Sequence, residues 1–306
     1  MKSVRRLLVP LLLALLTMFS VIACNSGSST SGGGGSIKVA SKDFTEQFIL
    51  GEMYALVLED QGLKVERKLN LGGTPVAQAG LQSGKIDLYP EYTGTGLLTV
   101  LKQPAKSDQK QVFDTVSKAY KEKFNLVWLE PAPMNNNQAL VMTQEGSKKY
   151  AIKSISDMKA KASQLTIIGP PEFEAREDGL PGLKKSYGDF KLKKFIPADS
   201  GLRYQTLTNG QADVAVAFGT DGEISAFKLV VLEDDKKLFP PYQVAPVVRQ
   251  EVLEKNPGIR DALNAIAPKL TSETMQRLNY EVSGKKREPA EVAKDFLTKE
   301  ALLKKA

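Results

Sequence analysis

The chain has 306 residues, of which 42 are basic and 35 acidic, and it contains one cysteine and no histidine. Without histidine, Ser-His-Asp and Cys-His catalysis and nearly all zinc chemistry are excluded. The net charge of +7 is mild, and the lysines are scattered rather than interleaved with aromatic residues, so nucleic acid is not an expected partner.

The first 23 residues have the order of a secretory signal, with a basic start and an apolar core at 7–19 that is too short to span a membrane. Small and aliphatic residues then lead into Cys24, as in a lipobox, so we expect cleavage before Cys24 and a lipid on its sulfur. An ordinary secretory signal is the alternative. Residues 24–36 are rich in Gly and Ser and predict a flexible tether.

Apolar runs that predict strands alternate with helical patterns in the folded part of the chain. The predicted strands are at 37–41, 63–69, 86–90, 165–169, 193–197 and 213–218, and helices are predicted at 44–60, 76–83 and 289–305. This alternation favours βαβ units with largely parallel sheets. Asp43 and Glu46 have the spacing of a capping box at the start of the first helix, and Gly62 would end that helix.

One internal repeat runs at a constant offset of 126 residues. Its paired positions are Leu81 and Leu207, Gly84 and Gly210, Asp87 and Asp213, Tyr92 and Phe218, and Gly96 and Gly222. The repeat favours two lobes of similar topology, each placing one aromatic residue at the carboxyl end of a strand, where open α/β sheets bind ligands. Chance matching of βα units is the alternative.

Two groups of residues are candidates for ligand binding. If the lobes face each other, Tyr92 and Phe218 would hold a cation without hydrogen-bond donors, since a quaternary ammonium is attracted to ring faces. Arg176 lies in a charged loop and could hold a carboxylate in a bidentate manner, although a solvated loop is the ordinary interpretation. Glu172 and Glu174 are too close in one loop to be expected as a glycosidase pair.

Seven stretches in order resemble one family. They are "SKDFTEQFILGEM", "GGT", "YPEYTGTGL", "WLEPAPMNNNQAL", "EFEAREDGLPGLKKSYG", "DSGLRYQTLTNGQADVAVAFGTDGEI" and "VLEDDKKLFPPYQVAPVVR". The chain thereby resembles, over nearly all of its length after the tether, the substrate-binding proteins of glycine betaine/choline/carnitine ABC importers, the osmoprotectant-uptake family. The resemblance implies a binding protein and not an enzyme.

The resemblance implies an α/β, two-lobed type II periplasmic-binding-protein fold. Each lobe would be a mixed, mostly parallel sheet flanked by helices, with the ligand in the cleft between the lobes. Lobe I would contain residues 37–135 and 240–306, and lobe II residues 136–239. The implied partners are a small zwitterionic or cationic solute, an ABC permease and, through the lipid, the membrane. We expect a monomer, with no cofactor and no metal.

The resemblance also implies a set of ligand-binding residues. These are Lys42, Tyr92, Thr95, Asn137, Gln138, Arg176, Phe218, Thr220 and Tyr242. Tyr92, Phe218 and Tyr242 would be walls of an aromatic cage around a trimethylammonium head, and Arg176 would bind the carboxylate.

The chain departs from the family pattern at two cage positions. Gln138 stands where many relatives have an aromatic residue, and Phe218 stands where they often have Tyr. Losing one cation–π face of about 0.5 to 2 kcal/mol would weaken betaine binding unless another ring, such as Tyr204, compensates. The predicted ligand is therefore glycine betaine, or else choline or carnitine, and the alternative is a hydrogen-bonding solute such as an amino acid.

Overall fold

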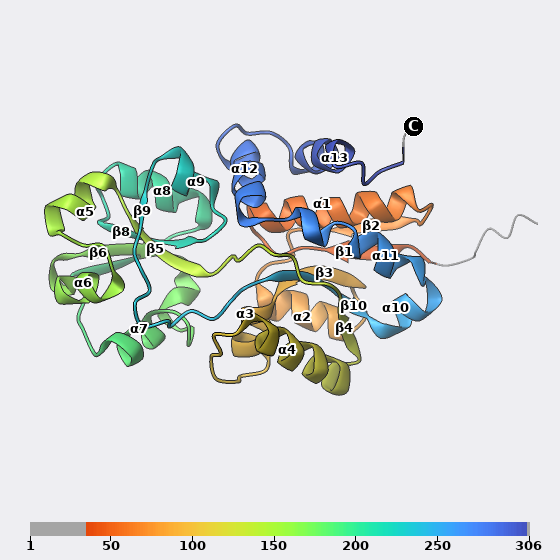
Figure 1. Ribbon diagram of the computed structural model, residues 1–306, viewed down its shortest axis with the longest axis horizontal. Coiled ribbons are helices and arrows are strands. Elements are labelled where there is room, and N and C mark those ends of the chain that lie inside the picture. The colour runs from red at the N-terminus through yellow and green to blue at the C-terminus, as the bar shows by residue number, and fades with distance from the viewer. Residues whose placement is uncertain (1–34, 305–306) are drawn as a thin grey trace, which may run out of the picture. The chain divides into compact units, whose positions relative to one another are not determined.

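The computed structural model describes residues 35–304, so the predicted signal peptide, Cys24 and nearly all of the predicted tether lie outside the described residues. Within 35–304, no helix combines the length and the apolar character needed to cross a membrane. The described residues form two five-stranded sheets, and we call the elements packed on the first sheet lobe I and those on the second lobe II (Figure 1).

The sheet of lobe I has the order β2-β1-β3-β10-β4, and β10 runs antiparallel to both of its neighbours. Its strands are β1 (Ile37–Ala40), β2 (Val65–Lys68), β3 (Leu88–Tyr92), β4 (Leu126–Trp128) and β10 (Val244–Arg249). One face is covered by α1 (Thr45–Asp60), α10 (Gln250–Lys255), α11 (Gly258–Asn264), η4 (Ala267–Lys269), α12 (Ser272–Ser283) and α13 (Pro289–Lys299). The other is covered by α2 (Thr74–Gln82), α3 (Thr93–Thr95), η1 (Gly96–Val100) and α4 (Gln109–Phe124).

The sheet of lobe II has the order β7-β6-β8-β5-β9, and β5 takes the antiparallel place that β10 has in lobe I. Its strands are β5 (Gln138–Met142), β6 (Thr166–Gly169), β7 (Lys194–Pro197), β8 (Val214–Phe218) and β9 (Val230–Val231). Its helices are α5 (Gln144–Tyr150), α6 (Ile155–Ala160), η2 (Ala162–Gln164), η3 (Pro171–Glu174), α7 (Leu180–Tyr187), α8 (Ser200–Thr208) and α9 (Gly222–Ala226).

The two lobes repeat the same local structure at the offset of 126 residues. Helix α2 corresponds residue for residue to α8, and strand β3 to β8. Gly84 and Gly210 follow the two helices with φ of 72° and 71°, a conformation that glycine adopts without strain. Asp87 and Asp213 each accept a hydrogen bond of 2.8 Å from a backbone N–H in a neighbouring parallel strand, Lys38 of β1 for Asp87 and Thr166 of β6 for Asp213. The paired residues therefore have the same structural role in both lobes.

The start of α1 differs from its predicted cap. The N-cap residue is Phe44 rather than Asp43, and it makes no side-chain capping bond. The prediction of a capping box was wrong because the Glu46 carboxylate turns away from the helix start and is buried against groups from distant parts of the chain. Gly62 does follow the helix, with φ of 81°.

Two segments run between the sheets, one from β4 to β5 and the other from β9 to β10 (Figure 1). The proposed lobe boundaries at 136 and 240 fall in these segments and stay a proposal. The two segments are bonded to each other, since Asn136 N donates to Tyr242 O at 3.0 Å, and the first is also bonded to β10 of lobe I, where Ala132 N donates to Val244 O at 2.8 Å. The carboxyl ends of β3 and β8 adjoin the region where the two segments meet.

Candidate functional site

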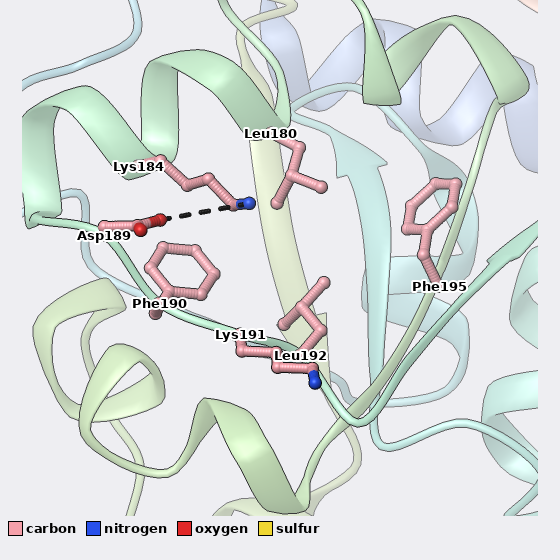
Figure 2. A pocket seen from close by; sticks show the side chains of 7 residues that line it. All are labelled: Leu180, Lys184, Asp189, Phe190, Lys191, Leu192 and Phe195. Atoms are coloured by element: carbon pink, nitrogen blue, oxygen red, sulfur yellow. Dashed lines mark ion pairs between the residues drawn. The ribbon is translucent and has the colours of Figure 1, made fainter.

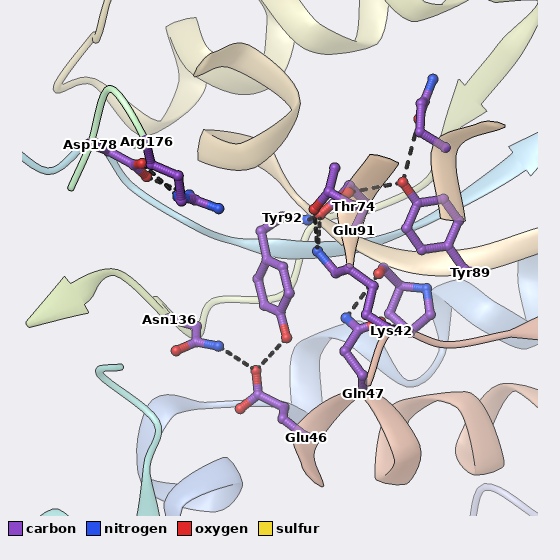
Figure 3. A network of polar contacts seen from close by, with 12 residues as sticks. Lys42, Glu46, Gln47, Thr74, Tyr89, Glu91, Tyr92, Asn136, Arg176 and Asp178 are labelled. Carbon is purple, nitrogen blue, oxygen red and sulfur yellow. Dashed lines mark hydrogen bonds and ion pairs between the residues drawn. The ribbon is translucent and has the colours of Figure 1, made fainter. Parts of the chain in front are cut away.

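A buried ion pair stands at the carboxyl end of β3. Lys42 Nζ lies 2.7 Å from Glu91 Oε1 and donates to Thr74 Oγ1 at 3.3 Å (Figure 3). Both side chains are buried, with 4% of Lys42 and none of Glu91 exposed. Burial lowers the pKa of the Lys42 ammonium, and the adjacent Glu91 carboxylate opposes that shift. The carboxyl end of β3 therefore adjoins a buried basic group.

Two aromatic rings of lobe I lie against this ammonium. The Phe44 and Tyr92 rings are stacked with centroids 6.2 Å apart and planes 24° from parallel. Lys42 Nζ is 4.8 Å from the Tyr92 centroid and 5.9 Å from that of Phe44. Both distances lie in the range in which a cation is attracted to a ring face. Lobe I thus already holds one cation at its aromatic pair.

Glu46 forms the polar centre of the same region. Its Oε1 accepts from the Tyr92 hydroxyl and from Asn136 Nδ2, both at 2.7 Å, as Figure 3 shows. Its Oε2 accepts from Asn279 Nδ2 at 2.9 Å. Only 3% of Glu46 is exposed and these three partners are neutral, so burial raises the pKa of the carboxyl group.

Lobe II presents a similar arrangement at the end of β8. The Arg203 Cζ lies 5.2 Å from the Phe218 centroid and 5.5 Å from that of Tyr204. Asp221 accepts from the Phe218 backbone N–H at 2.9 Å and from the Tyr204 hydroxyl, and Arg203 Nη2 is 3.5 Å from its carboxylate. Each lobe therefore has an aromatic pair beside a buried cation and an acid.

A third cluster joins the lobes. Arg176 donates from Nε and Nη2 to the two oxygens of Asp178 at 2.7 and 2.6 Å, and the Tyr242 hydroxyl donates to the same carboxylate. Burial alone would raise the pKa of Asp178, but the bonds from Arg176 hold it below its usual value. Gly94 permits the approach of Tyr242, because an added Cβ would lie 2.7 Å from atoms of that ring.

A pocket lies between the two lobes, and Lys42, Tyr92, Arg176 and Tyr242 are not among the residues that line it. Its lining includes Phe44, Glu46 and Asn279 from lobe I and Arg203, Tyr204 and Phe218 from lobe II. The lobes touch beside it, since Asn279 Nδ2 donates to the Thr220 carbonyl at 2.8 Å and Gln276 Nε2 to that of Gly219 at 2.8 Å. Rings, the carboxyl groups of Glu46, Asp221 and Glu223, and one guanidinium thus surround a space between two lobes.

The family model described as the substrate-binding domain of ABC-type glycine betaine transport systems matches residues 35–299. The chain belongs to this family. The two mixed sheets confirm the predicted type II fold. A solved structure of a glycine betaine/carnitine/choline ABC transporter superposes with a TM-score of 0.73 at 33% identity and covers 87% of this chain and 99% of its own.

Two curated relatives of this substrate-binding protein are informative. The carnitine transport binding protein OpuCC of Listeria monocytogenes is 36% identical over 296 residues, covering 93% of this chain and 96% of that protein. The ergothioneine transport permease/ergothioneine binding protein EgtU of Helicobacter pylori is 38% identical over 260 residues, covering 85% of this chain and 46% of that protein.

Six of the predicted ligand-binding residues stand in the contacts described above. Lys42 and Tyr92 are together in lobe I, Arg176 and Tyr242 meet at Asp178, Phe218 lines the pocket, and Thr220 bonds to Asn279 through its carbonyl. Their role in ligand binding stays a prediction.

The other three predicted residues lie at the ends of secondary-structure elements. Thr95 is buried in α3, directly after β3. Asn137 is half-buried, and its carbonyl accepts from Gly219 N at 2.9 Å. Gln138 begins β5 with 3% of its surface exposed, and its side-chain amide is close enough to the Tyr242 hydroxyl to affect the pKa of that tyrosine. Gln138 therefore lies beside another of the predicted ligand-binding residues.

Several residues that line the pocket between the lobes were not predicted from the sequence. Phe44 and Glu46 both stood within "SKDFTEQ", and Glu46 was assigned to a helix cap instead. Arg203 stood in "GLRYQ" beside Tyr204, but no spacing rule marks it as the neighbour of Phe218. Asn279 lies in the helical C-terminal part, where it has no motif around it.

A second pocket lies on the surface of lobe II, away from these groups. Its lining combines apolar side chains such as Phe190 and Phe195 with Lys184, whose Nζ is 3.9 Å from Asp189 Oδ1 (Figure 2). It contains none of the predicted residues. Within 35–304, no group of three or more His, Cys, Asp or Glu side chains is placed to hold a metal ion.

Proposed function

We propose that this protein captures a quaternary-ammonium compatible solute, glycine betaine and also choline or carnitine, in an aromatic cage between its lobes. It then delivers the solute unchanged to an ABC permease. The observation that carries the proposal is the shared pocket, in which Phe44 of lobe I and both Tyr204 and Phe218 of lobe II face one space. Rings from opposite lobes would bring the lobes together around one cation.

The chemistry of the pocket suits such a head group. A trimethylammonium donates no hydrogen bonds, so ring faces and nearby carboxylates are its main sources of attraction, at about 0.5 to 2 kcal/mol for each ring. Tyr204 supplies a ring in the pocket although Gln138 supplies none, and Glu46 and Asp221 add acidic character. This arrangement supports the proposed cage despite the two departures from the family pattern.

The solute carboxylate would be held at the basic side of the cleft. Arg176 uses Nε and Nη2 on Asp178, so Nη1 is the guanidinium nitrogen that would meet a ligand. Lys42 is near enough for Arg176 to lower its pKa, so both cations act on the same region. A zwitterion would therefore lie with its carboxylate toward Arg176 and its ammonium toward the rings.

The cellular setting belongs to the same proposal. A lipid on Cys24 would hold the protein outside the cytoplasm, and the Gly/Ser-rich residues before β1 would let the binding domain reach its permease. Solute binding would favour the form in which the lobes are in contact, as in hinge closure of binding proteins generally.

Calorimetric titration tests this proposal. Protein lacking residues 1–24 is expected to bind glycine betaine, choline or carnitine with a Kd below millimolar, and isosteric neutral or primary-amine analogues much more weakly, because only the methylated head suits the rings. The panel includes ergothioneine and the common amino acids. Binding of an amino acid with no response to any methylammonium would overturn the proposal.

One observation favours a second candidate, a solute with hydrogen-bonding groups. Gln138 is a buried amide within reach of the Tyr242 hydroxyl, and it can offer a ligand a donor or an acceptor that a ring cannot. The EgtU relative is an ergothioneine-binding protein by name, and ergothioneine combines a trimethylammonium and a carboxylate with a polar heterocycle. This candidate keeps the cage and adds a polar contact to Gln138.

Replacing Gln138 with tyrosine separates the two candidates. If the solute is a simple betaine, the added ring face is expected to tighten glycine betaine binding by about 3- to 10-fold. If the solute needs the amide, Gln138→Tyr is expected to weaken the binding of ergothioneine or an amino acid, and the binding of glycine betaine is expected to stay weak. Parallel titration of both proteins against both solutes gives the answer, and Gln205→Tyr on the exposed surface of α8 is the matched control.

A further inference from the structure

Two amide oxygens around Glu46 have no hydrogen-bond partner among the described residues. They are Asn136 Oδ1 and Asn279 Oδ1, and both are buried. The residues themselves are 6% and 4% exposed. A buried acceptor left unpaired is costly, so two of them in one place need a physical explanation.

The bonds to Glu46 fix the direction of both amides. Asn136 Nδ2 donates to Glu46 Oε1, while Asn279 Nδ2 donates both to Glu46 Oε2 and to the Thr220 carbonyl. Turning either amide over would set its oxygen against a carboxylate or a carbonyl oxygen. The nitrogens are therefore held by Glu46, and the oxygens remain as acceptors that cannot be exchanged for donors.

Both amides line the same pocket as the rings of Phe44 and Phe218. Figure 3 shows the Asn136 amide and the Tyr92 hydroxyl meeting at Glu46, and Phe44, which stacks on Tyr92, lines the pocket together with Asn136. A methylated ammonium is attracted to the rings but cannot donate a hydrogen bond to an amide oxygen. A hydroxyl or N–H group elsewhere on the same solute could donate that hydrogen bond.

We propose that Asn136 and Asn279 form an acceptor subsite, held in place by Glu46, which makes the protein select methylammonium solutes that also carry a hydroxyl or N–H donor. This inference rests on the proposed function and narrows its substrate class. Glycine betaine has no such donor, whereas choline and carnitine each have a hydroxyl group. The subsite therefore ranks donor-bearing solutes above donor-free ones of the same size.

Carnitine and γ-butyrobetaine test the subsite, because they differ only in one hydroxyl group. In calorimetric titrations of the protein lacking residues 1–24, carnitine is expected to bind about 3- to 10-fold more tightly, as one recovered hydrogen bond predicts. Asn136→Ala is expected to bring the two affinities to within about twofold by removing the acceptor. Asn209→Ala, on the exposed end of α8, is the matched control and is expected to keep the wild-type ratio.

The outcomes separate this inference from the proposed function. Equal, submillimolar affinities of the wild-type protein for both solutes would overturn the subsite and leave the methylammonium proposal intact. Binding of neither solute, nor of choline or glycine betaine, would overturn the proposed function and the subsite with it. Because the wild-type ratio alone decides the first case, the test does not depend on the folding of any variant.

Discussion

Replacing Glu91 with glutamine is expected to lower the free energy of unfolding by about 3 to 5 kcal/mol. Glu91 is fully buried and accepts bonds from Lys42 Nζ, from the Tyr92 backbone N–H and from the Tyr89 hydroxyl, at 2.7, 2.7 and 2.8 Å. An amide keeps one acceptor oxygen but cannot neutralise the lysine. In the variant, the Lys42 ammonium would remain buried with only the ring faces and Thr74 as partners, or it would lose its proton.

The measurement is urea denaturation at neutral pH, with Asp114→Asn as the control. The Lys110–Asp114 pair has a similar separation of 2.6 Å, but both side chains are largely exposed, so solvent already screens their charges. The exposed pair should therefore contribute far less to the free energy of unfolding. Equal decreases of that free energy in the two variants would show that the Lys42–Glu91 pair is not required for the stability of lobe I.

The duplication of the fold could be predicted because it depends on local signals that recur. A leucine on a helix, a glycine after that helix and an aspartate before the next strand are each required by backbone geometry within about ten residues. Asp87 and Asp213 serve as such signals, since each is bonded to the parallel strand that neighbours the strand it precedes. Even so, the same kind of local rule failed at Glu46, where partners from elsewhere in the chain outcompeted a helix cap.

The arrangement of the candidate site was harder to predict because its contacts join residues that are far apart in sequence. Asn279 meets Glu46 across 233 residues, and Tyr242 meets Asp178 across 64. Neither contact follows from periodicity or from a motif. Motif resemblance could nominate single residues such as Arg176, but it could not show that Asp178 already occupies two of the nitrogens of that arginine.

Both aromatic pairs hold a cation that belongs to the protein. Lys42 lies against Phe44 and Tyr92, and Arg203 lies against Tyr204 and Phe218. Each of these cations also has an acid beside it, so the positive charge near the rings is partly neutralised. We infer that these internal pairs orient the rings, and that the solute competes for ring area beside them instead of finding an unused cage.

The ring of Tyr92 is therefore the most direct target for removing solute binding. Tyr92→Ala is expected to weaken glycine betaine or carnitine binding on the order of 100-fold, since both a cation–π face and the buried area of the ring are lost. Tyr92→Phe keeps the face and removes only the bond to Glu46, so it is expected to retain most of the affinity. Calorimetric titration measures both variants, with thermal unfolding to establish that each is folded. If folded Tyr92→Ala protein binds within threefold of the wild type, then the solute does not use the ring of Tyr92 as proposed.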